Sequence, residues 1–300
     1  MLPIVHHPGY VPPLRPGHPF PMSKYGFLKD ALIARGLLRP GGYLAPKVAS
    51  AAQVAMAHDP DYVQRVFSQR LYDQEVRRIG LEQSDRLLER IRLSASGTLL
   101  ASWLALEHGI ACNAAGGSHH AATGHGAGYC IFNDVAVAVR NLQAQGAVTK
   151  AMVFDADVHQ GDGTAEIFAG DPSVFTVSVH AEKNFPARKQ VSDLDLGLPD
   201  DTADTEYQQA LKGVLDQAFD AFDPQIVFYN AGVDVHAQDR LGRLGLSNDG
   251  IRARDHAVLA AVRRRGVPVV GVLGGGYAAD PSILAERHAI LFEEADRLAG

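Results

Sequence analysis

Short apolar runs alternate with longer amphipathic stretches through the second half of the chain. The apolar runs are Ile110–Ala114, Ala151–Phe154, Val174–Val179, Ile226–Tyr229 and Val267–Leu273. The stretches that we expect to be helices are Asn133–Gln145, Thr164–Phe168, Asp204–Phe222, Asn248–Arg265 and Pro281–Ala299. Continuous apolar strands alternating with helices are typical of a parallel sheet that is covered on both faces. The pattern therefore predicts an α/β fold in three layers, with helices on both sides of a central, mostly parallel sheet.

The first third of the chain has a helical pattern after a proline-rich start. Prolines are spaced too closely in residues 1–22 for a regular helix, because proline lacks the backbone donor and clashes with the preceding turn. We expect a short strand at Leu2–Val5 and a helix over Ser23–Arg35 that is capped by Ser23. A further helix should begin at Asp59-Pro60, and another should extend over Ser94–Glu107. No repeat or linker interrupts the pattern, so we predict a single domain over residues 1–300.

Polar and glycine-rich segments follow the apolar runs, where ligands bind in parallel sheets. They are Gly116-Gly117-Ser118-His119-His120, Gly124-His125-Gly126-Ala127-Gly128-Tyr129-Cys130, Asp155-Ala156-Asp157-Val158-His159-Gln160-Gly161-Asp162-Gly163, Asn230-Ala231-Gly232-Val233-Asp234 and Gly274-Gly275-Gly276-Tyr277. Most of these segments would also fit an ordinary loop if they occurred alone. Their joint placement after successive strands indicates one active site.

The segment from Asp155 to Gly163 is the strongest single signal. Alternating positions in extended chain face the same way, so Asp155, Asp157 and His159 can converge, and Asp162 can return after the glycine turn. Buried acids this close together would repel one another unless a cation or histidine partners balanced them. Carboxylate and imidazole are ligands for zinc and also for iron. Asp234 could complete a three-ligand site that keeps a position for water, as catalytic zinc sites do.

Composition narrows the possible partners and compartments. Acidic residues number 34 and basic residues 28, a formal charge of −6 that gives no support to binding of nucleic acid or an anionic membrane. The only cysteines are Cys112 and Cys130, which fit a reducing compartment, most simply the cytoplasm. No apolar run reaches the roughly 18 residues that span a bilayer. We expect a cytoplasmic protein and favour a monomer.

These motifs resemble the histone deacetylase family, which has the arginase–deacetylase fold. The resemblance covers nearly the whole chain and keeps the family's motif order, including Val177-Ser178-Val179-His180. It is greatest to the class IV branch, which shares His159-Gln160 and the segment Asp239-Arg240-Leu241-Gly242. The resemblance implies a metal-dependent amidohydrolase that removes an acyl group from a lysine side chain in a protein or peptide.

The resemblance also implies a role for each matching residue. Asp157, His159 and Asp234 would bind Zn²⁺, although Fe²⁺ could occupy the same ligands. His119 and His120 would transfer protons, oriented by Asp155 and Asp162 respectively, and Tyr277 would donate a hydrogen bond to the substrate carbonyl. The substrate tunnel would be lined by Gly128, Tyr129, Phe185 and Leu241. Backbone oxygens of Asp155, Asp157, His159 and Val179, with the Ser178 side chain, would bind K⁺.

Three other functions share part of this pattern. An acetylpolyamine or other small-molecule amidohydrolase would use the same metal chemistry on an acylated small amine. A dinuclear manganese enzyme of the arginase type would need an Asp-x-His-x-Asp order, whereas this chain has Asp155-Ala156-Asp157-Val158-His159. A non-catalytic binding module would be expected to lack an acid–base or oxyanion residue, and all of them are present here.

Overall fold

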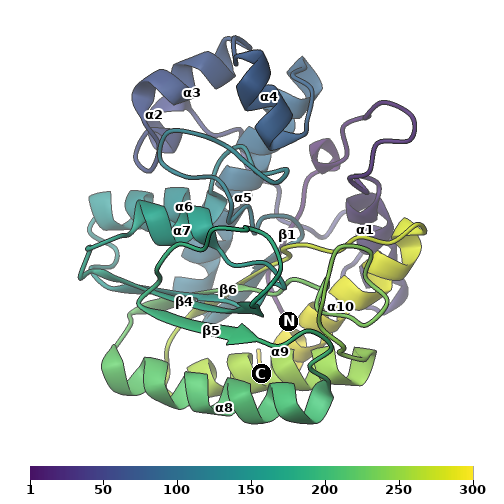
Figure 1. Cartoon of the computed structure of the whole chain (residues 1–300), viewed down its shortest axis with the longest axis vertical. Helices are drawn as coiled ribbons and strands as arrows, with labels where there is room; N and C mark the ends of the chain where they lie inside the picture. Colours follow the sequence, from purple (N-terminus) through teal and green to yellow (C-terminus); the bar gives the residue numbers. More distant parts are fainter. Residues whose placement is uncertain (300) are drawn as a thin grey trace.

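The computed structural model describes residues 1–299 and has a central sheet of seven strands (Figure 1). The sheet order is β1-β2-β7-β6-β3-β4-β5, and every neighbouring pair is parallel. The strands are β1 (Ile4–Val5), β2 (Ile110–Asn113), β3 (Ala151–Asp155), β4 (Val174–Ala181), β5 (Leu194–Leu198), β6 (Ile226–Asn230) and β7 (Val269–Val272). The predicted α/β class is confirmed.

Helices cover both faces of the sheet (Figure 1). On one side lie α5 (Asp85–His108), α6 (Asp134–Ala144) and α7 (Asp162–Ile167), with α2 (Ala51–Val54), α3 (Pro60–Phe67) and α4 (Asp73–Ile79) beyond them. On the other side lie α8 (Asp204–Ala221), α9 (Asn248–Arg263) and α10 (Pro281–Arg297), and α1 (Lys24–Ala34) packs on α10. The central strands are buried on both faces, which explains why they read as continuous apolar runs. No helix within residues 1–299 is both long and apolar enough to cross a membrane.

Several element boundaries follow the local chemistry that the sequence suggested. The Asp59 carboxylate accepts hydrogen bonds from the backbone N–H groups of Asp61 and Tyr62 and so caps α3, which begins at Pro60. Gly109 ends α5 in the left-handed conformation, which glycine adopts without steric cost.

Other expectations were incomplete. Ser23 precedes α1, but its side chain makes no capping hydrogen bond, so that prediction was wrong. Helix α5 begins at Asp85, nine residues before the predicted start at Ser94, because Ser84 caps it. Strand β5 was missed: it lies at the sheet edge, where its residues alternate between partly buried and exposed instead of forming an apolar run.

Candidate metal centre and catalytic pocket

Two aspartates and a histidine lie together at the carboxyl edge of the sheet. Asp157 and His159 follow β3, and Asp234 follows β6, the strand beside it. One ligand atom from each residue lies within 4.8 Å of the others, and all three side chains are buried. His159 Nδ1 is 3.1 Å from Asp157 Oδ1 and 3.3 Å from Asp234 Oδ2. The structure thus brings the three predicted metal ligands into one cluster.

Backbone hydrogen bonds fix the shape of this turn. The N–H of Asp157 donates to Asp155 Oδ1 at 3.0 Å, and the N–H of His159 donates to Asp157 Oδ1 at 3.0 Å. The N–H of Val158 donates to Asp234 Oδ1 at 3.0 Å, which ties the β3 loop to the β6 loop. Asp234 Oδ2 therefore stays free of backbone hydrogen bonds, whereas Asp157 Oδ2 accepts one from the Gly275 N–H at 2.6 Å.

The cluster fits a divalent cation. Burial and the nearby Asp157 carboxylate raise the pKa of Asp234 to about 7 in the absence of a cation. Asp234 Oδ2 is fully buried and has no hydrogen-bond partner among residues 1–299. Gly275 leaves the space beside it open, since a side chain there would collide with Asp234 Oδ2. Two carboxylates and an imidazole match the donor preference of zinc and of iron(II).

Two histidine–aspartate pairs lie beside the cluster. His119 Nδ1 is 2.7 Å from Asp155 Oδ2, and His120 Nδ1 is 2.6 Å from Asp162 Oδ1. The two imidazole rings are 4.1 Å apart between centroids. A carboxylate on Nδ1 fixes the orientation of each ring and leaves Nε2 as the nitrogen available for proton transfer.

The loop that carries these histidines is held by Asp134, a residue that the sequence analysis missed. Its buried carboxylate accepts hydrogen bonds from the backbone N–H groups of Gly117 and Ser118, at 3.2 and 2.8 Å. Gly116 and Gly117 have φ of 86° and 82°, which only glycine adopts readily. An acidic residue in the first turn of a helix is usually explained by a favourable interaction with the helix dipole, so no separate signal in the sequence indicated this role.

The histidines differ in their electrostatic surroundings. Burial alone would lower the pKa of His119, but the carboxylates of Asp155 and Asp157 outweigh this effect and raise the pKa to about 9. Burial and the positive charge of His119 lower the pKa of His120 to about 4. A divalent cation on the cluster would add positive charge and so lower the pKa of His119.

Aromatic rings enclose a small cavity above the metal ligands. Its volume is about 40 Å³, and its lining includes His119, His120, Tyr129 and Tyr277. The rings of Tyr129 and Tyr277 are 6.1 Å apart. Burial raises the pKa of Tyr277 well above its ordinary value, so its hydroxyl keeps its proton at neutral pH and can donate a hydrogen bond.

Phe20 forms a further wall of this cavity, and the sequence analysis missed it. Its ring lies 5.2 Å from that of Tyr129 and 6.4 Å from that of Tyr277. It comes from the loop before α1, which His18 ties to the Gly80 carbonyl at 2.9 Å. The proline-rich composition of residues 1–22 indicated a loop and did not indicate where that loop would lie.

The predicted tunnel residues occupy different depths. Gly128 and Tyr129 line the cavity, and a side chain at Gly128 would collide with the His120 ring. Phe185 and Leu241 lie outside the cavity lining and are 44% and 46% exposed. The Phe185 ring stands edge-on to His120 at 4.8 Å, and Asn184 Nδ2 donates to the Leu241 carbonyl at 2.9 Å. Phe185 therefore lies at the edge of the site, next to the Leu241 backbone.

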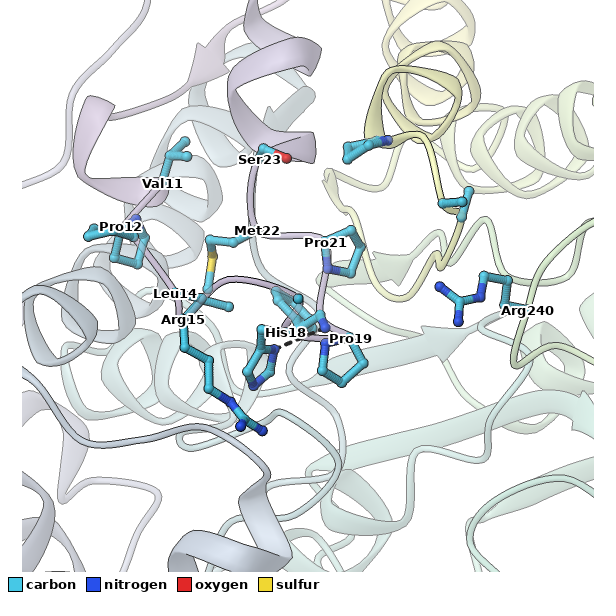
Figure 2. A pocket seen from close by; sticks show the side chains of 16 residues that line it. Val11, Pro12, Leu14, Arg15, His18, Pro19, Pro21, Met22, Ser23 and Arg240 are labelled. Carbon is cyan, nitrogen blue, oxygen red and sulfur yellow. Dashed lines mark hydrogen bonds between the residues drawn. The ribbon is translucent and has the colours of Figure 1, made fainter.

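A wider groove of about 460 Å³ adjoins the cavity (Figure 2). The groove is lined mainly by residues between Val11 and Ser23, and Arg240, Ala278, Ala279 and Pro281 complete the lining. Phe20 lines both the groove and the cavity and so separates them. In Figure 2 the Arg240 guanidinium extends toward the loop that carries His18 and Pro19.

The predicted K⁺ ligands lie behind the cluster, on β3 and β4. Asp155 pairs with Ser178 in the sheet register, and Val179 follows Ser178 in β4. The Ser178 hydroxyl lies 2.9 Å from His180 Nδ1. The positions are adjacent, and K⁺ binding stays a prediction.

A match to the histone deacetylase domain model covers residues 18–292. The chain belongs to the histone deacetylase domain family. Within this family, an uncharacterized protein of Picosynechococcus sp. is 45% identical over 293 residues, which cover 98% of each chain. Histone deacetylase 2 of Arabidopsis thaliana is 30% identical over 270 residues, covering 87% of this chain and 70% of that protein.

A solved structure shows the same fold. The crystal structure of the HDA15 HD domain aligns with a TM-score of 0.80 and 21% identity, over 98% of this chain and 89% of that one. Membership of the histone deacetylase family and the buried Asp157–His159–Asp234 cluster together indicate a metal-dependent amidohydrolase.

Proposed function

We propose that this protein hydrolyses the amide bond of Nε-acyl-lysine in a protein or peptide. The observation that carries the proposal is the convergence of three kinds of group on one small cavity. These groups are the three candidate metal ligands, the two histidine–aspartate pairs and the phenol ring of Tyr277. Aromatic walls suit the four methylenes of a lysine stem, and the name of the Arabidopsis relative supports a deacetylase.

The residues of the chain would divide the reaction between them. When bound, a divalent cation would polarise the amide carbonyl and lower the pKa of a water molecule. Asp157, His159 and Asp234 would hold this cation. His120, oriented by Asp162, would take the proton from water, and His119 or His120 would return a proton to the leaving amine. Tyr277 would donate a hydrogen bond to the oxygen that becomes negative, a contribution of about 3–4 kcal/mol in comparable sites.

The metal and the subfamily are part of the same proposal. We favour Zn²⁺, with Fe²⁺ compatible with the same donors, and K⁺ at the site formed by β3 and β4. Placement in the class IV branch rests on the resemblance at His159-Gln160. The buried Gln160 side chain donates to the Gln190 carbonyl and accepts from the Gln190 N–H. The two cysteines are both free and buried, which favours a reducing compartment such as the cytoplasm.

The test is turnover by metal-analysed protein on one peptide sequence that carries acetyl, trifluoroacetyl, octanoyl or myristoyl lysine, with acetylspermidine alongside. We expect turnover of at least one lysine peptide and its loss in Asp157→Ala. Cleavage of acetylspermidine without any lysine peptide would replace the proposal with a polyamine amidohydrolase. No turnover of any substrate by protein holding one metal ion per chain would refute acyl-lysine hydrolysis.

A further inference from the structure

Arg254 is a fully buried arginine directly beneath the metal centre. It lies on α9, the helix that covers the sheet face beside α8 and α10 (Figure 1). Its side chain has no exposed surface. Nη1 donates to two backbone carbonyls, that of Ala156 at 3.0 Å and that of Gly232 at 2.5 Å. One guanidinium nitrogen therefore joins two separate loops.

These loops carry the metal ligands. The Ala156 carbonyl belongs to the peptide bond that leads into Asp157, and Gly232 precedes Asp234 by two residues. The loops already lie as close as their backbones allow, because a side chain at Gly232 would collide with the carboxylate and the Cα of Asp157. A change in how Arg254 holds either carbonyl would alter the spacing between Asp157 and Asp234.

The charge of Arg254 is balanced away from the metal ligands. Asp255 Oδ1 accepts a hydrogen bond from Arg254 Nε at 2.9 Å and lies 2.8 Å from Nη2. The Tyr229 hydroxyl donates to the same oxygen at 2.6 Å. Because Asp255 neutralises the guanidinium, the carboxylates of Asp157 and Asp234 are left free for a cation.

Stability alone is a weak explanation for this arrangement. A buried ion pair pays a large desolvation penalty, and replacing one with well-packed apolar side chains is often neutral or stabilising. Partners in the shell around a metal site act differently, since they orient the ligands and typically change metal affinity by about 10–100-fold when they are removed.

We propose that Arg254 is a positioning residue for the metal centre, which holds the Asp157 and Asp234 loops at the separation that cation binding requires. This inference rests on the proposed metal-dependent function. Arg254 would not touch the divalent cation. It would act only through its hydrogen bonds to the carbonyls of Ala156 and Gly232. Lysine would keep the charge without the planar fork of donors that reaches both carbonyls and Asp255.

The experiment compares Arg254→Met and Arg254→Lys with wild type and with Arg252→Met. Arg252 is on the same helix but pairs with Glu293 and Glu294, away from the site. Zn²⁺ affinity is measured by competition with a chromophoric chelator, and the visible spectrum of the Co²⁺-loaded protein reports ligand geometry. We expect both Arg254 variants to bind Zn²⁺ at least tenfold more weakly and to shift the Co²⁺ spectrum. We expect Arg252→Met to match wild type in both.

A second variant keeps the test decisive if Arg254→Met fails to fold. Tyr229→Phe removes only the hydrogen bond that orients Asp255, and we expect a smaller loss of Zn²⁺ affinity in the same direction. A folded Arg254 variant with wild-type affinity and spectrum would overturn the proposal. Wild-type protein that binds metal but cleaves no acyl-lysine would refute the proposed function alone, because the affinity and spectral readouts do not depend on turnover.

Discussion

Protonation of His58 should loosen the loop that carries the two site histidines. His58 is buried between that loop and the start of α6. The N–H of Asn133 donates to His58 Nε2 at 2.9 Å, so Nε2 is unprotonated and the ring's proton lies on Nδ1, which donates to the Ala122 carbonyl at 2.9 Å. A protonated ring can no longer accept the bond from Asn133.

The size and sign of the effect follow from the pKa of this ring. Burial lowers the pKa of His58 from 6.5 to about 4, so the unfolded chain takes up the proton first. The neutral ring therefore stabilises the fold fully above pH about 6.5, and this contribution is lost as the pH falls toward 4. The shift corresponds to about 3 kcal/mol over the whole range. About 2 kcal/mol of this is lost between pH 7 and pH 5.

Urea unfolding at pH 7 and pH 5 measures this loss, with excess EDTA present so that pH-dependent metal binding makes no contribution. The free energy of unfolding of His58→Gln should be lower than that of wild type at pH 7. This difference in unfolding free energy should narrow by about 2 kcal/mol at pH 5, because glutamine does not titrate. His108→Gln, at the exposed end of α5, is the control for loss of a histidine outside this loop. A gap between wild type and His58→Gln that is equal at both pH values would refute the argument.

Three further predictions concern the metal, the oxyanion donor and a helix cap. Chelation should abolish deacylation by the wild-type protein, and added Zn²⁺ should restore it. Asp157→Ala should remain inactive and bind little metal after the same addition. Wild-type activity that survives complete chelation would contradict this prediction. Tyr277→Phe should lower kcat by about 100-fold or more with metal content unchanged, and full activity would sink the role of its hydroxyl. Asp59→Ala should cost about 1 kcal/mol of unfolding free energy and Ser23→Ala about none, since only Asp59 makes a capping bond; equal losses in urea unfolding would refute this.

The candidate metal ligands were predictable because each lies within four residues of the end of a strand that the apolar pattern had located. Asp157 and His159 follow β3, and Asp234 follows β6. Parallel strands deliver the residues after them to the same sheet edge, so knowing the strands was enough to place the ligands together. The pairing of His119 with Asp155 needed the resemblance to the histone deacetylase family, because residue spacing alone does not show which carboxylate meets which imidazole.

The residues that support the site from a distance were not predictable in this way. Phe20 reaches the cavity from a loop about 250 residues before Tyr277, its neighbour across the cavity. Arg254 reads in the sequence as one of several charges on an amphipathic helix, where most such residues face solvent. Its full burial depends on tertiary contacts with the loops that follow β3 and β6, which no local pattern describes.

Different parts of this fold therefore hold the candidate metal ligands and shape the cavity. The ligands lie at the ends of central strands, where sheet pairing and Arg254 constrain their backbone on several sides. The cavity walls come from loops that are held by other contacts, among them the hydrogen bond from His18 to Gly80 and the one from Asn184 to the Leu241 carbonyl. A substitution in those loops can reshape the cavity without moving a metal ligand. Relatives that keep the same metal centre should accordingly differ in the acyl groups they accept, and those differences should map to the loop before α1 and to the segment around Phe185.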